Sequence, residues 1–232
     1  MFEQISSLLF SPSTPLWEVA GLSLQVSGSA LLIAVVIGFP TAFYLVLTGT
    51  HQRTFIRIVI DTLMALPPVV VGLMVYLLLS RSGPLGIWGL LYTPLAMIMA
   101  QTMLITPIVI ALSLPLIEQH WQRLHHQLYV LGLQPPQMLY VLIYEARVGI
   151  VTITLAVFGR AIAEIGAVMI VGGNIEGHTR VMTTAIATET QQGNLALALA
   201  LGLLLIVIAF IINGCVHGVR FLAEKRMAGR AL

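Results

Sequence analysis

The chain has 232 residues, of which 58% are apolar and only 9% are charged, and its formal net charge is +2. A soluble domain carries about 25% charged residues, so lipid rather than water must solvate most of this surface. The small net charge gives no indication of nucleic-acid binding. The single cysteine, Cys215, excludes an internal disulfide framework and a cysteine metal cluster. These features predict an all-α, polytopic membrane protein.

The first fifteen residues are expected to lie outside the membrane. Phe2, Ile5, Leu8 and Leu9 fall at helical spacing, so this segment either lies flat on the outer interface or forms an unanchored tail. Residues 1–10 hold no Lys or Arg, so no secretory signal peptide is predicted.

Apolar runs long enough to cross about 30 Å of hydrocarbon, which takes ~20 residues, occur five times in the chain. They cover Leu22–Leu47, Ile56–Leu79, Trp88–Leu112, Gly149–Gly172 and Leu195–Val219. We therefore expect one transmembrane domain over residues 1–232 with about five membrane-spanning helices.

Prolines interrupt the first three predicted spans, at Pro40, at Pro67 and Pro68, and at Pro107. A proline removes a backbone hydrogen bond and kinks a transmembrane helix. Such kinks serve either packing or a transport pathway, and Pro67 and Pro68 are candidates for shaping a gate.

The basic residues give the predicted orientation of the spans. Arg81 and Arg180 fall on one side, and Arg160 lies within the fourth span. The remaining eight fall on the other side: Arg53, Arg57, Arg123, Arg147, Arg220, Lys225, Arg226 and Arg230. The positive-inside rule makes the side with eight cytoplasmic. The N-terminus is therefore expected outside and the C-terminus in the cytoplasm.

A polar stretch over residues 118–147 separates the third and fourth spans on the cytoplasmic side. Gly132 can adopt positive φ and so end one helix, and Pro135 and Pro136 suit the first turn of the next. Leucines on both sides of the turn form an apolar face: Leu124, Leu128, Leu131, Leu139 and Leu142. This face either docks on a soluble partner or lies on the membrane surface or on its own bundle.

The fourth predicted span contains two charged residues, Arg160 and Glu164. Counted from Gly149, Arg160 lies about 16 Å into the membrane, where a lone charge costs on the order of 2.5–3.5 kcal/mol. The i,i+4 spacing lets the two side chains pair on one helix face. They form either a polar element of a transport pathway or gate, or a structural ion pair.

The sequence offers no catalytic set. The nine carboxylates form no paired-acid motif with metal-ligand spacing, and no phosphate-binding loop is present, since Lys225 is the only lysine. A membrane-embedded enzyme, such as a lipid-headgroup transferase, would need acidic or histidine motifs at the cytoplasmic ends of its spans. An ion channel would need polar repeats along a pore. We therefore expect no cofactor or metal site in this chain, and it cannot bind ATP through a phosphate-binding loop.

The polar stretch resembles the cytoplasmic loop of the membrane subunits of bacterial ABC importers. That loop has an acidic-alanine-alanine triplet, a glycine, and then an isoleucine followed by leucine-proline. Gly132 takes the glycine position and Leu142 the isoleucine position. His126-Gln127-Leu128 replace the triplet, and Tyr144-Glu145 replace leucine-proline.

Two further segments, residues 66–86 (LPPVVVGLMVYLLLSRSGPLG) and 159–186 (GRAIAEIGAVMIVGGNIEGHTRVMTTAI), resemble the permeases of molybdate, tungstate and sulfate importers. Residues 80–86 and 183–194 are most similar to the tungstate-type branch. The resemblance implies the type I importer fold and a homodimer of this chain. It also implies two cytoplasmic ATPase subunits that bind ATP and Mg²⁺, and an extracytoplasmic binding protein. Arg180, on the outer side, either meets that binding protein or is a solvated charge. Tungstate is the expected cargo, with molybdate and sulfate as alternatives.

Overall fold

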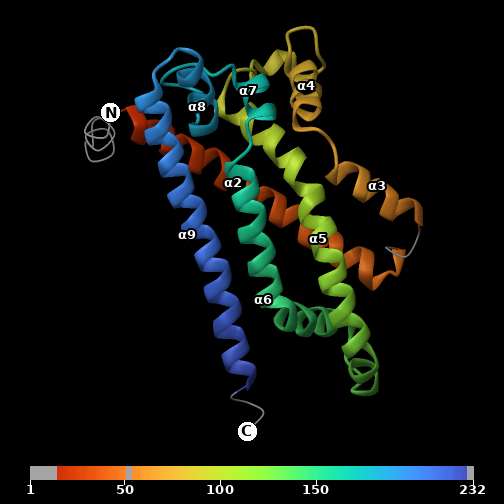
Figure 1. The fold of residues 1–232 in the computed structure, drawn as a ribbon. Helices are drawn as coiled ribbons and strands as arrows, with labels where there is room; N and C mark the ends of the chain where they lie inside the picture. Colours follow the sequence, from red (N-terminus) through yellow and green to blue (C-terminus); the bar gives the residue numbers. More distant parts are fainter. Residues whose placement is uncertain (1–14, 51–53, 229–232) are drawn as a thin grey trace.

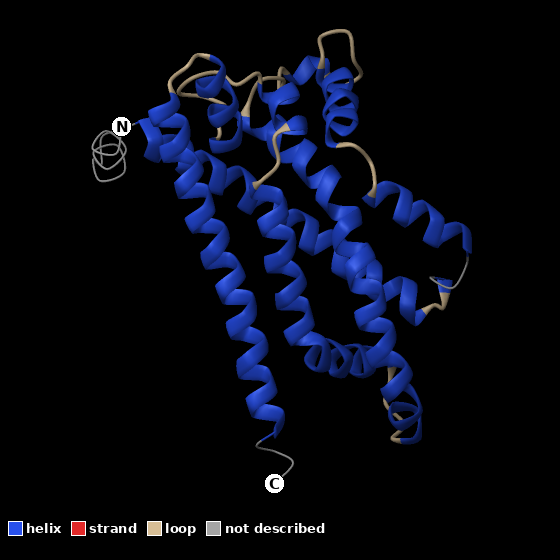
Figure 2. Cartoon of the chain, viewed as in Figure 1, coloured by secondary structure: helices blue, strands red, loops and turns tan. Residues whose placement is uncertain are grey.

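The computed structural model describes residues 15–50 and 54–228, and all regular structure within them is helical (Figure 2). The long helices are α2 (Pro15–Leu47), α5 (Pro94–Val130), α6 (Pro135–Ile162) and α9 (Leu195–Ala228). The short ones are α3 (Thr54–Met64), α4 (Pro68–Leu79), η2 (Gly86–Trp88), α7 (Gly166–Gly172) and α8 (Met182–Gln191). The predicted interfacial segment at residues 2–9, Arg53 and Arg230 lie outside the described residues.

Among the described residues, four helices are long and apolar enough to cross a membrane, and α3 with α4 makes a fifth span if the pair counts as one. The prediction of an all-α protein with about five spans is therefore confirmed.

The second predicted span is a broken pair of helices rather than one kinked helix. α3 and α4 meet at 89°, Pro67 is extended, and Pro68 begins α4. Each proline disfavours helical geometry in the residue before it, so two in succession end α3 and start a new helix. Pro40 in α2 and Pro107 in α5 instead lie inside helices that continue past them.

The fourth predicted span, Gly149–Gly172, is also corrected. The helix begins much earlier, at Pro135, and ends at Ile162, before the separate short helix α7. Oε1 of Glu164 accepts hydrogen bonds from the backbone N–H groups of Gly166 (2.8 Å) and Ala167 (3.3 Å). A side-chain acceptor at this place satisfies the first N–H groups of a new helix, and so it stabilises the break.

The helices pack into a bundle in which α2 and α6 both lie against α5, and α9 covers α6 (Figure 1). The largest apolar cluster joins α2, α3, α4, α5 and α6. A second cluster joins α2, α4, α5 and α7. There a Cβ added to Gly72 would lie 2.8 Å from Cα of Ala167, so only a glycine lets α4 and α7 approach this closely.

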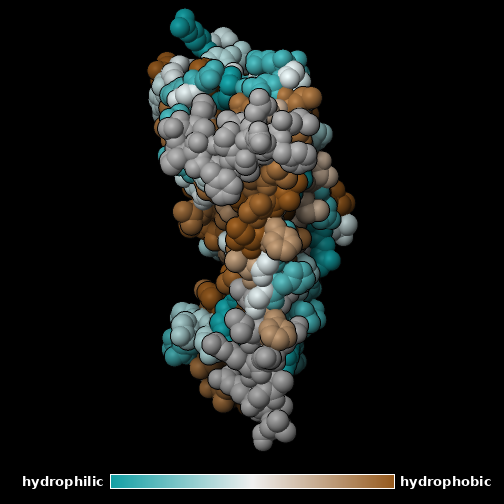
Figure 3. Space-filling view, turned by 60° about the vertical axis from the view of Figure 1, so that its left-hand side comes forward, coloured by the Kyte–Doolittle hydropathy of each residue, from teal (hydrophilic) through white to brown (hydrophobic). Residues whose placement is uncertain are grey.

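The surface of the bundle suits lipid. Leu32 and Val36 of α2 are 68% and 70% exposed, and Phe210 of α9 is 79% exposed. Figure 3 shows such apolar residues in the middle of the molecule, between regions richer in hydrophilic residues. In Figure 1 the α5–α6 turn and the C-terminal end of α9 lie at one end, and the α7–α8 and α8–α9 connections lie at the other. This two-sided layout is the one that the basic residues predict.

Candidate functional site

The turn between α5 and α6 has the geometry that its glycine and prolines predict. Gly132 has φ +67°, its N–H donates to Tyr129 O, and the N–H of Leu133 donates to Leu128 O. These two bonds form a Schellman motif, which satisfies the last carbonyls of α5. Pro135 then begins α6, and Gln137 Oε1 accepts from the N–H of Gln134 at 2.9 Å. The chain thus reverses direction within a few residues.

The leucines that flank this turn do not share one role. Leu142 is fully buried in the largest apolar cluster, Leu139 packs against that cluster, and Leu128 is 4% exposed. The side chains of Leu128 and Leu142 are therefore covered within the chain itself, and the part of these leucines in a coupling loop stays a prediction. Leu131 is 72% exposed and remains available.

A different set of side chains is uncovered at the turn, and we call it the turn patch. Val130 is 88% exposed. The other members are also large apolar or aromatic residues with exposed side chains: Tyr129, Leu131, Tyr140 and Tyr144. Exposed side chains of this kind are typical of a surface that another protein or the membrane covers.

The first turns of α6 lie across the foot of the bundle, and the rest of the helix rises from there (Figure 1). On the α5 side, Arg57 of α3 donates to Glu118 at 3.3 Å. This exposed ion pair contributes little stability, about 0–1 kcal/mol, but it ties α3 to the start of the polar stretch.

The predicted Arg160–Glu164 pairing is replaced by a different arrangement. α6 ends at Ile162, so Glu164 does not lie on the same helix as Arg160. Glu164 is 8% exposed and holds the start of α7. Arg160, in contrast, is an exposed residue in the last turn of a membrane-length helix.

A buried polar side chain that sequence reasoning missed lies beside this break. Gln101 of α5 is 2% exposed. Its Nε2 donates to the carbonyl of Ala161, at 2.6 Å, and to Ser27 Oγ, at 3.2 Å. The signal in the sequence was a lone amide within the apolar run of the third predicted span. Such a group is costly in lipid unless it is hydrogen-bonded inside the protein.

Pro67 and Pro68 lie at the corner between α3 and α4, and Pro67 is exposed. They set the direction of both helices, and their part in a gate stays a prediction.

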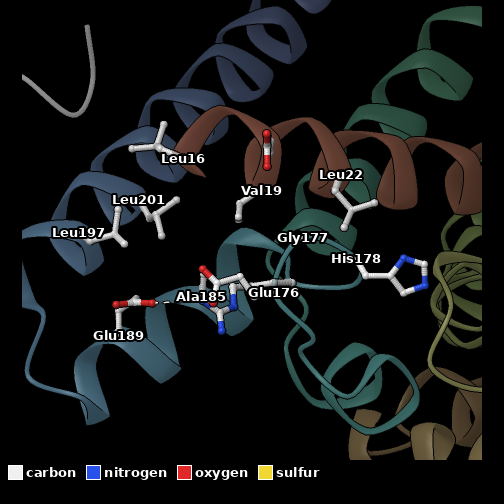
Figure 4. Close-up of a pocket in the computed structure, with 12 residues that line it drawn as sticks. Leu16, Val19, Leu22, Glu176, Gly177, His178, Ala185, Glu189, Leu197 and Leu201 are labelled. Atoms are coloured by element: carbon white, nitrogen blue, oxygen red, sulfur yellow. Dashed lines mark hydrogen bonds and ion pairs between the residues drawn. The ribbon is translucent and has the colours of Figure 1, made fainter. Parts of the chain in front are cut away.

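At the opposite end from the turn patch, a cavity of about 290 Å³ lies among α2, α8, α9 and the α7–α8 connection. Arg180 is not a free charge there. Its side chain is 16% exposed, and its Nη1 lies 3.4 Å from Glu189 Oε1 and 3.6 Å from Glu176 Oε2. In Figure 4, leucines lie on one side of the cavity and these two glutamates on the other. Across the described part of the chain, no group of three or more His, Cys, Asp or Glu could hold a metal ion.

Comparison with known proteins gives a consistent result. Residues 30–228 match the family of binding-protein-dependent transport system inner membrane components. The tungstate uptake system permease protein TupB of Peptoclostridium acidaminophilum is 37% identical over 94% of this chain and 96% of its own. A probable anion ABC transporter permease protein of Haloferax volcanii is 39% identical, over 94% of each chain. The TupB of Campylobacter jejuni is 39% identical over 93% of this chain and 90% of its own.

Proposed function

Because the chain belongs to the family of binding-protein-dependent transport system inner membrane components, we propose that it forms the path of an ATP-driven importer for tungstate. As a permease subunit it catalyses no reaction itself. The observation that carries the proposed cargo is the 37–39% identity, over nearly the whole chain, to two proteins named as tungstate uptake permeases. Molybdate and sulfate, which are also tetrahedral dianions, are the alternatives.

ATP and Mg²⁺ would be bound by a separate ATPase subunit, which docks at the α5–α6 turn. Three features support this role. The chain has no phosphate-binding loop. The turn patch is uncovered, with Val130 88% exposed. The turn also lies at the same end of the bundle as the C-terminal end of α9, which the basic residues predict to be cytoplasmic.

The path itself would form between two copies of this chain. Arg160 supports this arrangement, because an exposed guanidinium on a membrane-length helix has to face water or a protein surface rather than lipid. In a homodimer the two Arg160 side chains would border the path and balance the charge of a passing dianion. Glu164 would act on the path only through α7, whose first N–H groups it holds.

The cargo is tested in the native host by deleting the gene for this chain and measuring the uptake of tungstate, molybdate and sulfate by elemental analysis. We expect tungstate uptake at low external concentration to fall at least tenfold and to return when the wild-type gene is supplied. Excess molybdate or sulfate should compete weakly. Loss of molybdate or sulfate uptake with normal tungstate uptake would overturn the assignment, and so would normal uptake of all three.

A further inference from the structure

A small cavity lies where α2, α5 and the α6–α7 break meet. Its volume for a water-sized probe is about 10 Å³, which is roughly what a single water molecule requires. Among the residues that line it, the polar ones are Ser23, Ser27, Gln101, Glu164 and Thr183. All five are at least nine-tenths buried.

One of these side chains lacks a partner. Gln101 bonds to the carbonyl of Ala161, which can only accept, so the nitrogen of the amide is fixed as the bonded atom. The other amide atom, Oε1, is fully buried and has no hydrogen-bond partner. Buried acceptors almost always have a donor within reach, and ordered water often supplies it. A molecule in the cavity that reached Gln101 Oε1 would have to donate a hydrogen bond to it.

The neighbouring groups define the rest of the ligand. Glu164 also lines the cavity and offers a second acceptor, since within the described residues its carboxylate accepts from the backbone N–H groups of Gly166 and Ala167. Ser27 accepts from Gln101 and has its own hydroxyl proton to donate. A water molecule matches this set, because it donates twice and accepts.

A monovalent cation matches the site less well. The oxygen of Ser27 already accepts from Gln101 Nε2, and the oxygen of Ser23 accepts from the N–H of Met182 at 2.7 Å. Hydroxyl oxygens that accept from N–H groups direct fewer lone pairs at a cation.

We propose that this cavity is a binding site for one internal water molecule, which donates to Gln101 Oε1 and to the Glu164 carboxylate. The water completes a set of hydrogen bonds between the end of α6 and the start of α7, and we call this set the joint. Gln101 holds the end of α6 through Ala161 O, and Glu164 holds the start of α7. Thr183 of α8 donates to Glu164 O at 2.9 Å. Gln101 is thus a positioning residue that acts on α7 and α8 through the water.

The test is a cryo-EM map of the assembled importer at a resolution that shows ordered water. We expect a single peak within hydrogen-bond distance of both Gln101 Oε1 and the Glu164 carboxylate. Absence of that peak in the wild type overturns the proposal. A peak with five or more oxygens at cation distances, with a thermal stability that depends on sodium rather than choline, overturns it in favour of a cation.

Two variants sharpen the result. Gln101→Met keeps the length of the side chain but removes both the acceptor Oε1 and the donor Nε2 that bonds Ala161 O, so the peak should vanish and amide exchange across residues 166–172 should quicken. Thr102→Val is the control, because Thr102 also has a buried hydroxyl without a partner but does not line the cavity. It should leave both the peak and the exchange unchanged. Unchanged exchange in Gln101→Met, with the peak gone, would show that the water does not position α7.

Discussion

The two ends of α6 differ in whether the groups around them are exposed or buried. At Pro135 the helix follows a turn whose large side chains, among them Val130 and Leu131, are uncovered. At Ile162 the helix ends among buried polar groups, where Gln101 donates to Ala161 O and Glu164 starts the next helix. The first end leaves apolar side chains exposed. At the second end, the joint, nearly all buried polar groups have hydrogen-bond partners.

This difference indicates what each end is suited to do. Uncovered apolar side chains gain stability when a partner buries them, whereas a hydrogen-bonded joint resists local movement. One helix connects the two ends, so a displacement of the turn by an ATPase would reach the joint, and with it α7 and α8. The variants below test whether the two ends are as distinct as their geometry indicates.

The largest stability effect should come from Leu142, which belongs to the core although it lies in the predicted docking segment. Leu142→Ala removes a fully buried side chain and should lower the free energy of unfolding by about 2–5 kcal/mol. Leu131→Ala is the control, because Leu131 is 72% exposed. It should leave the stability of the purified permease nearly unchanged in thermal unfolding. Equal destabilisation by the two variants would mean that the leucines of the turn do share one role.

Gly132→Val tests the turn itself. A β-branched residue at φ +67° strains the backbone, by roughly 1–2 kcal/mol, and should displace the turn patch. We expect co-purification of the ATPase to fall at least tenfold. Gly193→Val is a matched control, since Gly193 has φ +81° and open space around it but lies at the other end of the bundle. If Gly193→Val also released the ATPase, the loss would reflect general destabilisation rather than the docking surface.

Glu164 tests the joint from the side of α7. Glu164→Ala removes the acceptor for the N–H groups of Gly166 and Ala167 and should cost about 0.5–2 kcal/mol. Amide exchange should quicken in α7 while binding of the ATPase stays intact. Glu164→Gln keeps an acceptor oxygen and should retain most of the stability. A loss of ATPase binding in Glu164→Ala would contradict the separation of the two ends.

Local signals predicted the turn well, because a glycine with positive φ and a proline at a helix start act through their own backbone. The breaks were harder to predict. Pro40 and Pro107 leave their helices continuous, whereas Pro67 and Pro68 end one, and the difference arises from two prolines in succession.

Tertiary contacts decided the rest of the site. No local pattern shows that Leu142 faces its own bundle rather than a partner, or that Glu164 caps α7 instead of pairing with Arg160. The acceptor on which Gln101 depends, Ala161 O, lies 60 residues along the chain. Its hydrogen bond therefore becomes visible only once α5 and α6 are packed together.

Arg160 gives the smallest expected effect on stability and the clearest test of the path. Its side chain is exposed, so Arg160→Gln should change the free energy of unfolding by no more than about 0.5 kcal/mol. If the two Arg160 side chains of a dimer border the path, tungstate uptake should nevertheless fall severalfold, and Arg160→Lys should restore part of it because the charge returns. ATPase co-purification measured in the same membranes separates this effect from faulty assembly. If the Arg160→Gln variant assembled normally and took up tungstate at the normal rate, Arg160 would not act on the path.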